Sequence, residues 1–453
     1  MRKSKTYLGA VVAIGAAAGL LAMSSWAPTP AVAGGGETGF PDETWAATAV
    51  VSLPTGSQII SFDISYVDAK LGKYVLGDRT NKAVDLVDTT TGAGTFLTAT
   101  PPFAGAPATC ASPNACSGPD GVIIVPAANT GSGANEVWAG DGDSSVKVIP
   151  LDGPNAGTTT HHILTNGSFR ADENCLDTVD NLFMTANNAD SPPFGTIIST
   201  KDYTIKHQIK FTNSTNGAEQ CAWSPRTGMF YITLPGVETP DNGHGVVEVI
   251  DPKSGAVVKT FDIPLEVCGT PQGMALGPEP QIMVGCNEGS GVSGNNLHSG
   301  IIINERNGSI IAVLPNEAGP DEVYYGAGTA EYFLAQSGSA PTCSPTGCTG
   351  NQLLGVVDAT FKQDDASIAT ANKSIKGRSA HSVAADSKTK KVFVPIPAGV
   401  GLTPTGVCTS AGGSDANGCI AIFTTTSPDR GRPIVGRNDD DDDHGHDHGH
   451  DHD

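Results

Sequence analysis

The feature that most constrains the fold of this chain is an internal repeat of short strand-like segments between residues 60 and 426. The clearest copy, residues 74–88, reads Tyr-Val-Leu-Gly-Asp-Arg-Thr-Asn-Lys-Ala-Val-Asp-Leu-Val-Asp and is followed by Thr-Thr-Thr-Gly. A second copy spans residues 137–150, and five more pair segments that begin at residues 182 and 195, 230 and 246, 282 and 300, 332 and 354, and 392 and 419. Period-two patterning and turn residues indicate strands, and no segment sustains helical periodicity over three turns.

Seven such units of about 50 residues predict a seven-bladed β-propeller, because a four-stranded unit buries its apolar faces only against its neighbours. The 56 Gly and 31 Pro residues agree with an all-β fold, since both residue types break helices and form turns. The last unit ends at its third strand near Phe423, and residues 46–53 have the pattern of the missing outer strand. We therefore expect an N-terminal strand to complete the last blade and close the ring.

The strand pairs resemble the YVTN-type β-propeller repeat of exported and surface proteins, best over residues 63–92, 219–263 and 381–394. This resemblance implies a propeller and export, but a fold does not by itself imply a reaction. The six-bladed calcium-dependent lactonase family has a similar strand pattern and is the alternative.

The N-terminal residues 1–33 are typical of a secretory signal peptide. Arg2, Lys3 and Lys5 precede an apolar run over residues 7–23, and Ala31-Val32-Ala33 suits cleavage after Ala33. The alternative is an uncleaved anchor, although the run is at the lower limit for a membrane span. No other segment is apolar enough to cross a bilayer, so we expect a periplasmic or secreted protein with a linker (34–45), a propeller (46–430) and a C-terminal tail (431–453).

The ten cysteines of an exported chain predict disulfides, because the compartment is oxidising. Absence of a C-x-x-C doublet argues against a zinc–thiolate site. Sequence alone does not determine the pairing. Three suggested pairs are close in sequence, Cys110/Cys116, Cys343/Cys348 and Cys408/Cys419, and the two suggested for the remaining cysteines are Cys175/Cys221 and Cys268/Cys286.

The formal charge of −21 argues against nucleic acid as a partner and favours cations. Part of this charge lies in the last sixteen residues, which contain eight Asp and five His and are expected to be disordered. Alternating imidazoles and carboxylates suit Zn, Cu or Ni. The predicted ligands are His444, His446, His448, His450, His452, Asp447 and Asp451. Similar His/Asp-rich segments occur in bacterial metal-handling proteins; the competing interpretation is a tail that only solubilises.

A polar residue opens the first strand of each unit, and five of these residues precede an apolar second-strand residue by eleven positions, as Asp63 precedes Tyr74. In a propeller, these openings surround the central channel. The predicted ring is Asp63, Asp120, Asp172, Glu219, Gln272, Asp321 and His381. The oxygen-rich ring suits Ca²⁺, whereas His381 favours a transition metal such as Zn²⁺. The competing interpretation is that polar residues merely solvate the strand ends.

Two functions follow from these features. The first is an exported binding protein or scaffold whose tail buffers or delivers divalent metal, with a protein or small-molecule ligand on the looped face. That face would be formed by residues 103–118, 236–245, 287–299, 336–352 and 397–418, unless these loops are tolerated surface insertions. The alternative is a lactonase-like, metal-dependent hydrolase or lyase, with the channel ring holding Ca²⁺ or Zn²⁺ and His381 as the general base.

Overall fold

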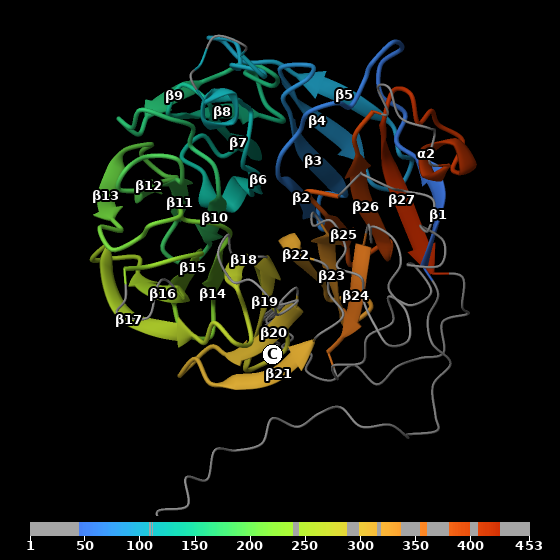
Figure 1. Cartoon of the computed structure of the whole chain (residues 1–453). Helices are drawn as coiled ribbons and strands as arrows, with labels where there is room; N and C mark the ends of the chain where they lie inside the picture. Colours follow the sequence, from blue (N-terminus) through green and yellow to red (C-terminus); the bar gives the residue numbers. More distant parts are fainter. Residues whose placement is uncertain are drawn as a thin grey trace, which may run out of the picture.

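The protein is a ring of seven antiparallel sheets around a central axis (Figure 1). The first strands of six blades line a cavity of about 320 Å³ there, which is the central channel. The computed structural model describes residues 45–107, 110, 112–238, 244–287, 299–314, 319–336, 354–359, 380–398 and 406–425. The signal-like segment and the His/Asp tail lie outside these residues. Within them, strands dominate and helix is confined to single turns, so the predicted all-β, seven-bladed propeller is confirmed.

Blades 1 to 3 follow the chain in order, each with four strands from the channel outward. Blade 1 contains β2 (Ser65–Asp68), β3 (Lys73–Asp78), β4 (Ala83–Asp88) and β5 (Gly94–Leu97). Blade 2 contains β6 (Val122–Val125), β7 (Glu136–Asp141), β8 (Ser145–Pro150) and β9 (His161–Leu164). Blade 3 contains β10 (Asn174–Asp177), β11 (Leu182–Asn187), β12 (Phe194–Ser199) and β13 (Ile205–Lys210). Two 3-10 turns, η1 (Pro113–Cys116) and η2 (Ala127–Asn129), flank β6.

Blades 4 to 6 repeat the arrangement. Blade 4 contains β14 (Cys221–Ser224), β15 (Met229–Leu234), β16 (Gly245–Asp251) and β17 (Ala256–Ile263). Blade 5 contains β18 (Thr270–Leu276), β19 (Gln281–Asn287), β20 (Ser299–Asn304) and β21 (Ile310–Leu314). Blade 6 contains β22 (Pro320–Gly326), β23 (Glu331–Gln336) and β24 (Leu354–Asp358), which are its three strands among the described residues.

Blade 7 joins the two ends of the propeller. Its sheet order is β1-β27-β26-β25, with β1 (Trp45–Val50) as the outer strand beside β27 (Cys419–Thr425). The inner strands are β26 (Lys391–Ile396) and β25 (Ala384–Asp386), and the short helix α2 (Val407–Ser410) precedes β27. Because Trp45 pairs with Thr425 and Val50 with Ala421, the predicted closure by an N-terminal strand is confirmed.

The repeated turn motif has a local explanation. After β4, the Asp88 carboxylate accepts hydrogen bonds from the backbone of Thr90 and Thr91, and Gly92 adopts a positive φ of 73°. Gly92 N then donates to Asp88 O at 2.8 Å. Blade 4 repeats this turn, where Gly255 N donates to Asp251 O at 2.9 Å. The Asp and the left-handed Gly together reverse the chain toward the outer strand.

Apolar packing lies between blades rather than inside a single core. Seven clusters of buried side chains are present, one at each interface between neighbouring blades. Tyr74 of blade 1 stacks on Phe393 of blade 7 with ring centroids 4.9 Å apart, and Trp138 meets Phe183 at the same separation between blades 2 and 3. Middle strands such as β7 and β11 are buried along their whole length because both faces are covered.

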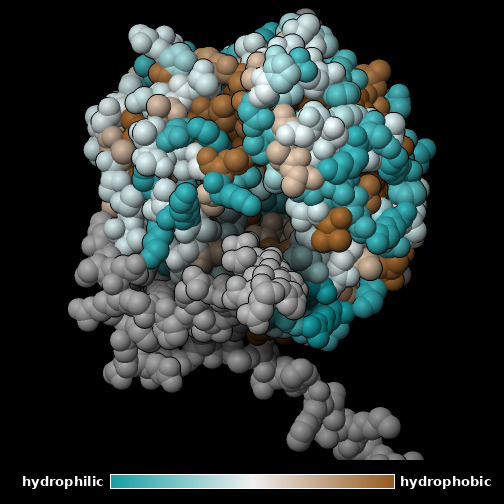
Figure 2. Space-filling model, turned by 180° about the vertical axis from the view of Figure 1, so that it is seen from behind, coloured by the Kyte–Doolittle hydropathy of each residue, from teal (hydrophilic) through white to brown (hydrophobic). Residues whose placement is uncertain are grey.

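Parts of the outer strands are exposed to solvent, as Leu164 in β9 and Val257 and Val258 in β17 show. Seen from behind the view of Figure 1, hydrophobic residues are scattered among hydrophilic ones around the central hollow (Figure 2). Within the described part of the chain, no helix is long and apolar enough to span a membrane.

Four of the five predicted disulfides are confirmed. Cys175–Cys221 joins the first strands of blades 3 and 4. The other three bonds each lie within one loop or one blade, and they are Cys110–Cys116, Cys268–Cys286 and Cys408–Cys419. The remaining prediction, Cys343/Cys348, lies outside the described residues.

Candidate functional site at the channel mouth

The strand register brings the predicted ring positions to equivalent places. In blades 1 to 4 the backbone N–H of the opening residue donates to the second strand: Asp63 to Gly77 O, Asp120 to Gly140 O, Asp172 to Ala186 O and Glu219 to Thr233 O, at 2.7–3.0 Å. Blades 6 and 7 have the same register as blade 1. In each, the first-strand residue that pairs with the aligned second-strand residue lies four positions after the opening residue, which is Asp63, Asp321 or His381. The spacing therefore identified structurally equivalent residues at the channel mouth.

The neighbouring blades approach each other closely at these positions. A Cβ atom on Gly77 would lie 2.4 Å from Asp120 O, and one on Gly140 would lie 2.2 Å from Ala171 O. Glycine at this point of the second strand lets the opening segment of the next blade pack directly against it. The acidic side chains are consequently drawn together around the channel, and carboxylate oxygens of Asp63, Asp120 and Asp172 lie within 4.8 Å of one another.

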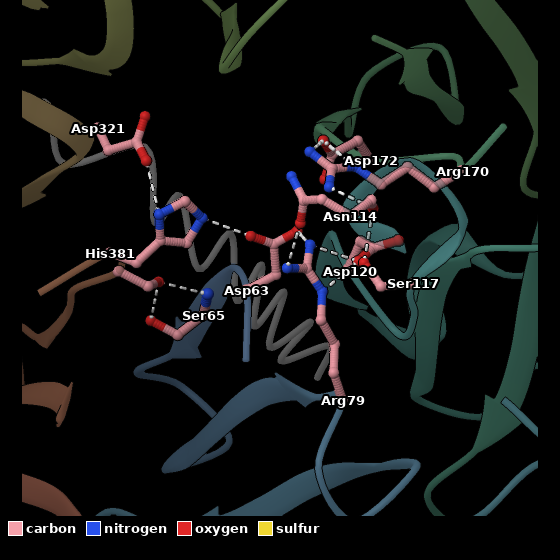
Figure 3. A network of polar contacts seen from close by, with 11 residues as sticks. Asp63, Ser65, Arg79, Asn114, Ser117, Asp120, Arg170, Asp172, Asp321 and His381 are labelled. Atoms are coloured by element: carbon pink, nitrogen blue, oxygen red, sulfur yellow. Dashed lines mark hydrogen bonds and ion pairs between the residues drawn. The ribbon is translucent and has the colours of Figure 1, made fainter. Parts of the chain in front are cut away.

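Arg79, from the β3–β4 turn, holds two of these carboxylates (Figure 3). Its guanidinium contacts Asp63 and lies 2.6 Å from Asp120 Oδ1, and it also donates to Asn114 Oδ1 at 3.0 Å. Burial alone would raise the pKa of Asp63, but the charges of Arg79 and His381 hold that pKa well below its usual value. The arginine side chain is 7% exposed, so these ion pairs are formed away from bulk solvent.

Arg170 makes the matching contact to the third acidic residue. Its Nε donates to Asp172 Oδ2 at 2.7 Å, and its Nη1 donates to the backbone oxygen of Asn114 at 2.8 Å. Asn114 belongs to η1, in the loop braced by Cys110–Cys116, and therefore bridges both guanidinium groups. Burial raises the pKa of Asp172 to about 7, despite the opposing charge of Arg170.

His381 links three blades across the closing point of the ring. Its Nε2 lies 2.5 Å from Asp63 Oδ1 and its Nδ1 lies 2.6 Å from Asp321 Oδ2 (Figure 3). Burial opposes a charge on the imidazole, but Asp321 and Asp63 outweigh it and raise the pKa of His381 well above its usual value. Each ring nitrogen therefore faces a carboxylate oxygen, an arrangement that favours the imidazolium form of the side chain.

A second acidic pair lies beside the ring. Glu173 and Glu322 follow Asp172 and Asp321 in the chain, on blades at opposite sides of the channel, and each is 4% exposed. Burial and then neighbouring carboxylates raise both pKa values well above the usual range, and a side-chain hydrogen bond joins the two groups. Two buried carboxyls in contact share a proton rather than both ionising.

Several of these groups were not predicted from sequence. Arg79, Arg170 and Asn114 are absent from the predicted ring, although Arg170 stands only two residues before Asp172. The repeated Asp-Glu dipeptide at residues 172–173 and 321–322 is a signal for the second acidic pair. Gln272 lies within β18, where its Oε1 is buried without a hydrogen-bond partner among the described residues.

The fit of the ring to a metal ion depends on which carboxylate oxygens remain open. Asp63 uses both oxygens for His381 and Arg79, while Asp120 and Asp172 each use one for an arginine. Asp120 Oδ2 and Asp172 Oδ1 are buried and without a hydrogen-bond partner among the described residues. A divalent ion would find only these two oxygens, next to two guanidinium groups that repel it, so the paired arrangement fits a metal poorly.

Comparisons with known proteins support the fold alone. No protein-family model matches the sequence, and no curated protein matches it. A chain of the solved structure "Crystal Structure of Mitotic Checkpoint Complex" is similar with a TM-score of 0.52 and 8% identity, covering 86% of this chain and 96% of that one. A chain of "Kuenenia stuttgartiensis Hydrazine Synthase" gives a TM-score of 0.50 at 12% identity, covering 75% and 95%. The class defined is thus the seven-bladed β-propeller, and YVTN membership stays a prediction.

Proposed function

We propose that this protein is an exported β-propeller that binds a ligand rather than transforming one, and that its C-terminal tail binds divalent transition metal. The observation that carries the binding role is the state of His381. A general base needs a free nitrogen lone pair, and both nitrogens of His381 are hydrogen-bonded to carboxylates. The side chain that the hydrolase interpretation requires as its base is instead held between two carboxylates, which favour its protonated form. The propeller fold is consistent with a binding or scaffold role, although a fold does not by itself fix a function.

The metal-binding part of the proposal rests on the tail sequence. Five histidines at alternate positions, with Asp447 and Asp451 between them, offer neutral imidazole and carboxylate ligands for Zn²⁺, Cu²⁺ or Ni²⁺. The tail would buffer or deliver the ion outside the cytoplasm, while the propeller acts as the scaffold. Export itself rests on the signal-like residues 1–33.

A metal titration of the full-length chain with Zn²⁺ tests the tail. One variant replaces His444, His446, His448, His450 and His452 with Asn, and a matched control replaces the five residues Asp439 to Asp443 with Asn and keeps every histidine. We expect the histidine variant to lose Zn²⁺ binding and the aspartate control to retain most of it. Equal affinity in both variants and in the unchanged chain would contradict the tail proposal.

One observation favours the alternative, a metal-dependent hydrolase or lyase: the carboxylate oxygens of Asp63, Asp120 and Asp172 lie within 4.8 Å of one another. Metal analysis of protein truncated after Arg437 separates the two proposals, because the tail ligands are removed while the channel carboxylates remain. Stoichiometric Ca²⁺ or Zn²⁺ in the truncated protein, lost on Asp120→Asn substitution, would favour the enzyme. A metal-free truncated protein would leave the binding role.

A further inference from the structure

A polar groove of about 450 Å³ lies beside the ion-pair network. Its walls come from η1, from the β11–β12 loop and from the segment that leads into β14. The lining is rich in hydroxyl and amide side chains, includes Arg170, Asp190 and Glu219, and contains no aromatic residue. This volume falls in the range of small-molecule sites, roughly 300–1,000 Å³, and is far larger than a single ion needs.

The charged residues of the groove differ in whether their side chains already have hydrogen-bond partners in the protein. Arg170 is held by Asp172 and Asn114, and the Asp190 carboxylate accepts hydrogen bonds from the backbone of Ser168 and Phe169. The Glu219 carboxyl has no hydrogen bond or ion pair with any described residue. It is therefore the charged group of this groove that is open to a ligand.

A second acceptor in the same groove lacks a donor. Asn188 is 9% exposed, and its Oδ1 is buried without a hydrogen-bond partner in the described part of the chain. A buried acceptor without a partner costs about 1–3 kcal/mol unless a donor arrives. The accessible Glu219 carboxyl, beside a groove lined by hydroxyl and amide side chains, suits a ligand group with several N–H bonds.

The excess of carboxyls at the channel mouth indicates that this ligand group carries a positive charge. Among the described residues, seven carboxyls gather there against three cationic side chains. The carboxyls belong to Asp63, Asp120, Asp172, Glu173, Glu219, Asp321 and Glu322, and the cations are Arg79, Arg170 and His381. The excess of negative charge must be neutralised by protons or by a bound cation.

We propose that the groove binds the ammonium or guanidinium group of a polar organic ligand, with the Glu219 carboxylate as its counter-ion. The surrounding hydroxyl and amide side chains hydrogen-bond the uncharged part of the ligand. This proposal rests on the proposed binding role of the propeller, and it is independent of metal binding by the tail.

Proton release gives the proposal a direct readout. Burial, followed by the charges of Asp321 and Asp172, raises the pKa of Glu219 to about 8, although Arg170 and His381 act in the opposite direction. At pH 7 a carboxyl with that pKa is roughly nine-tenths protonated. A cation that binds the carboxylate must therefore expel close to one proton, whereas a ligand held at exposed, already ionised carboxylates away from the channel mouth expels none.

The experiment is calorimetry on the full-length chain at pH 7, in two buffers of different ionisation enthalpy, so that the proton count is measured. The probes are spermidine, the blocked tripeptide Ala-Lys-Ala, and the same tripeptide with an acetylated lysine ammonium. We expect at least one ammonium probe to bind with release of nearly one proton and the acetylated peptide not to bind. Preference for spermidine or for the tripeptide distinguishes a free amine from a lysine-bearing peptide.

The variant Glu219→Gln and the matched control Glu266→Gln, which removes an exposed carboxylate in the segment before β18, assign the effect. We expect Glu219→Gln to weaken binding at least about tenfold and to abolish proton release, and Glu266→Gln to change neither. Three results would overturn the proposal: neither ammonium probe binds, acetylation makes no difference, or CaCl₂ expels the proton in place of the amines. The preference for the ammonium probes over the acetylated peptide is measured on the unchanged protein, so it tests the proposal even if Glu219→Gln folds poorly.

Discussion

Replacing Arg79 with Met should destabilise the propeller strongly, because it leaves two buried carboxylates without their counter-ion. Arg79 is 7% exposed, Asp63 is 2% exposed and Asp120 is fully buried. With an effective dielectric constant near 20, two charges about 4 Å apart attract by about 4 kcal/mol. The two pairs together therefore contribute up to about 8 kcal/mol before desolvation, and less where Asp120 is protonated, because burial raises its pKa well above the usual value. Desolvation of the guanidinium offsets several kcal/mol of this, and we expect a net loss of about 3–5 kcal/mol at pH 7.5.

The pH dependence separates this cost from a simple packing defect. In the unchanged protein the pKa of Asp63 is lowered, so its contribution to stability is present above pH ~4 and is lost as the pH falls through the folded-state pKa. Without Arg79 the pKa of Asp63 would be raised, and the pKa of Asp120, which burial already raises well above its usual value, would rise further, so both would take up protons in mild acid. The difference between variant and parent should therefore be largest above pH 7 and shrink toward pH 4.5.

Urea unfolding at pH 4.5, 6 and 7.5, followed by tryptophan fluorescence without reductant, measures this difference. The matched control is Arg306→Met, because Arg306 pairs with Glu279 on the surface, where the two side chains are 64% and 49% exposed. An exposed pair contributes less than about 1 kcal/mol, with little pH dependence. Equal losses for the two variants, or a loss at Arg79 that does not change with pH, would refute the electrostatic account of the channel mouth.

Three further predictions concern stability. Gly77→Ala should cost about 1–3 kcal/mol, seen as a lower melting temperature, because the new Cβ would lie 2.4 Å from a carbonyl oxygen of the next blade. Asp172 and Glu219 have pKa values raised to about 7 and about 8, above those of the unfolded chain. Their contribution is complete below pH ~4 and is lost as the pH rises through these values, so the melting temperature should fall between pH 5 and pH 8.5; a flat or rising profile would contradict this. Removing the Cys175–Cys221 bond by a double Ala substitution should cost about 2–4 kcal/mol, since it closes a loop of 46 residues. A loss below about 1 kcal/mol in urea unfolding would show that apolar packing alone holds blades 3 and 4 together.

The architecture was predictable because the repeat fixes several levels of structure at once. The spacing of eleven residues between Asp63 and Tyr74 recurs in four other units, and this register survives intact in the folded sheets. The apolar pattern of residues 46–53 was enough to place β1, because the last unit lacks an outer strand and a ring cannot leave that edge open.

The ion-pair and hydrogen-bond partners at the candidate site could not be predicted from the repeat. Arg79 lies in a turn between strands, and nothing in its sequence position shows that it reaches the opening residue of the next blade. Asn114 reaches both arginines from an irregular loop, whose path depends on a disulfide and on backbone contacts between blades. Periodicity identifies side chains that share a position in the repeat, but it does not reveal partners that break the repeat.

The pairing of β1 with β27 also has a consequence for biosynthesis and engineering. During synthesis the ring cannot close until Thr425 has been made, because β27, the strand that pairs with β1, is the last strand of the propeller to be synthesised. Residues 45 and 425 are directly opposed in that blade. A circular permutant that joins them through a short linker, with new ends in the loop between β8 and β9, should therefore assemble the same ring.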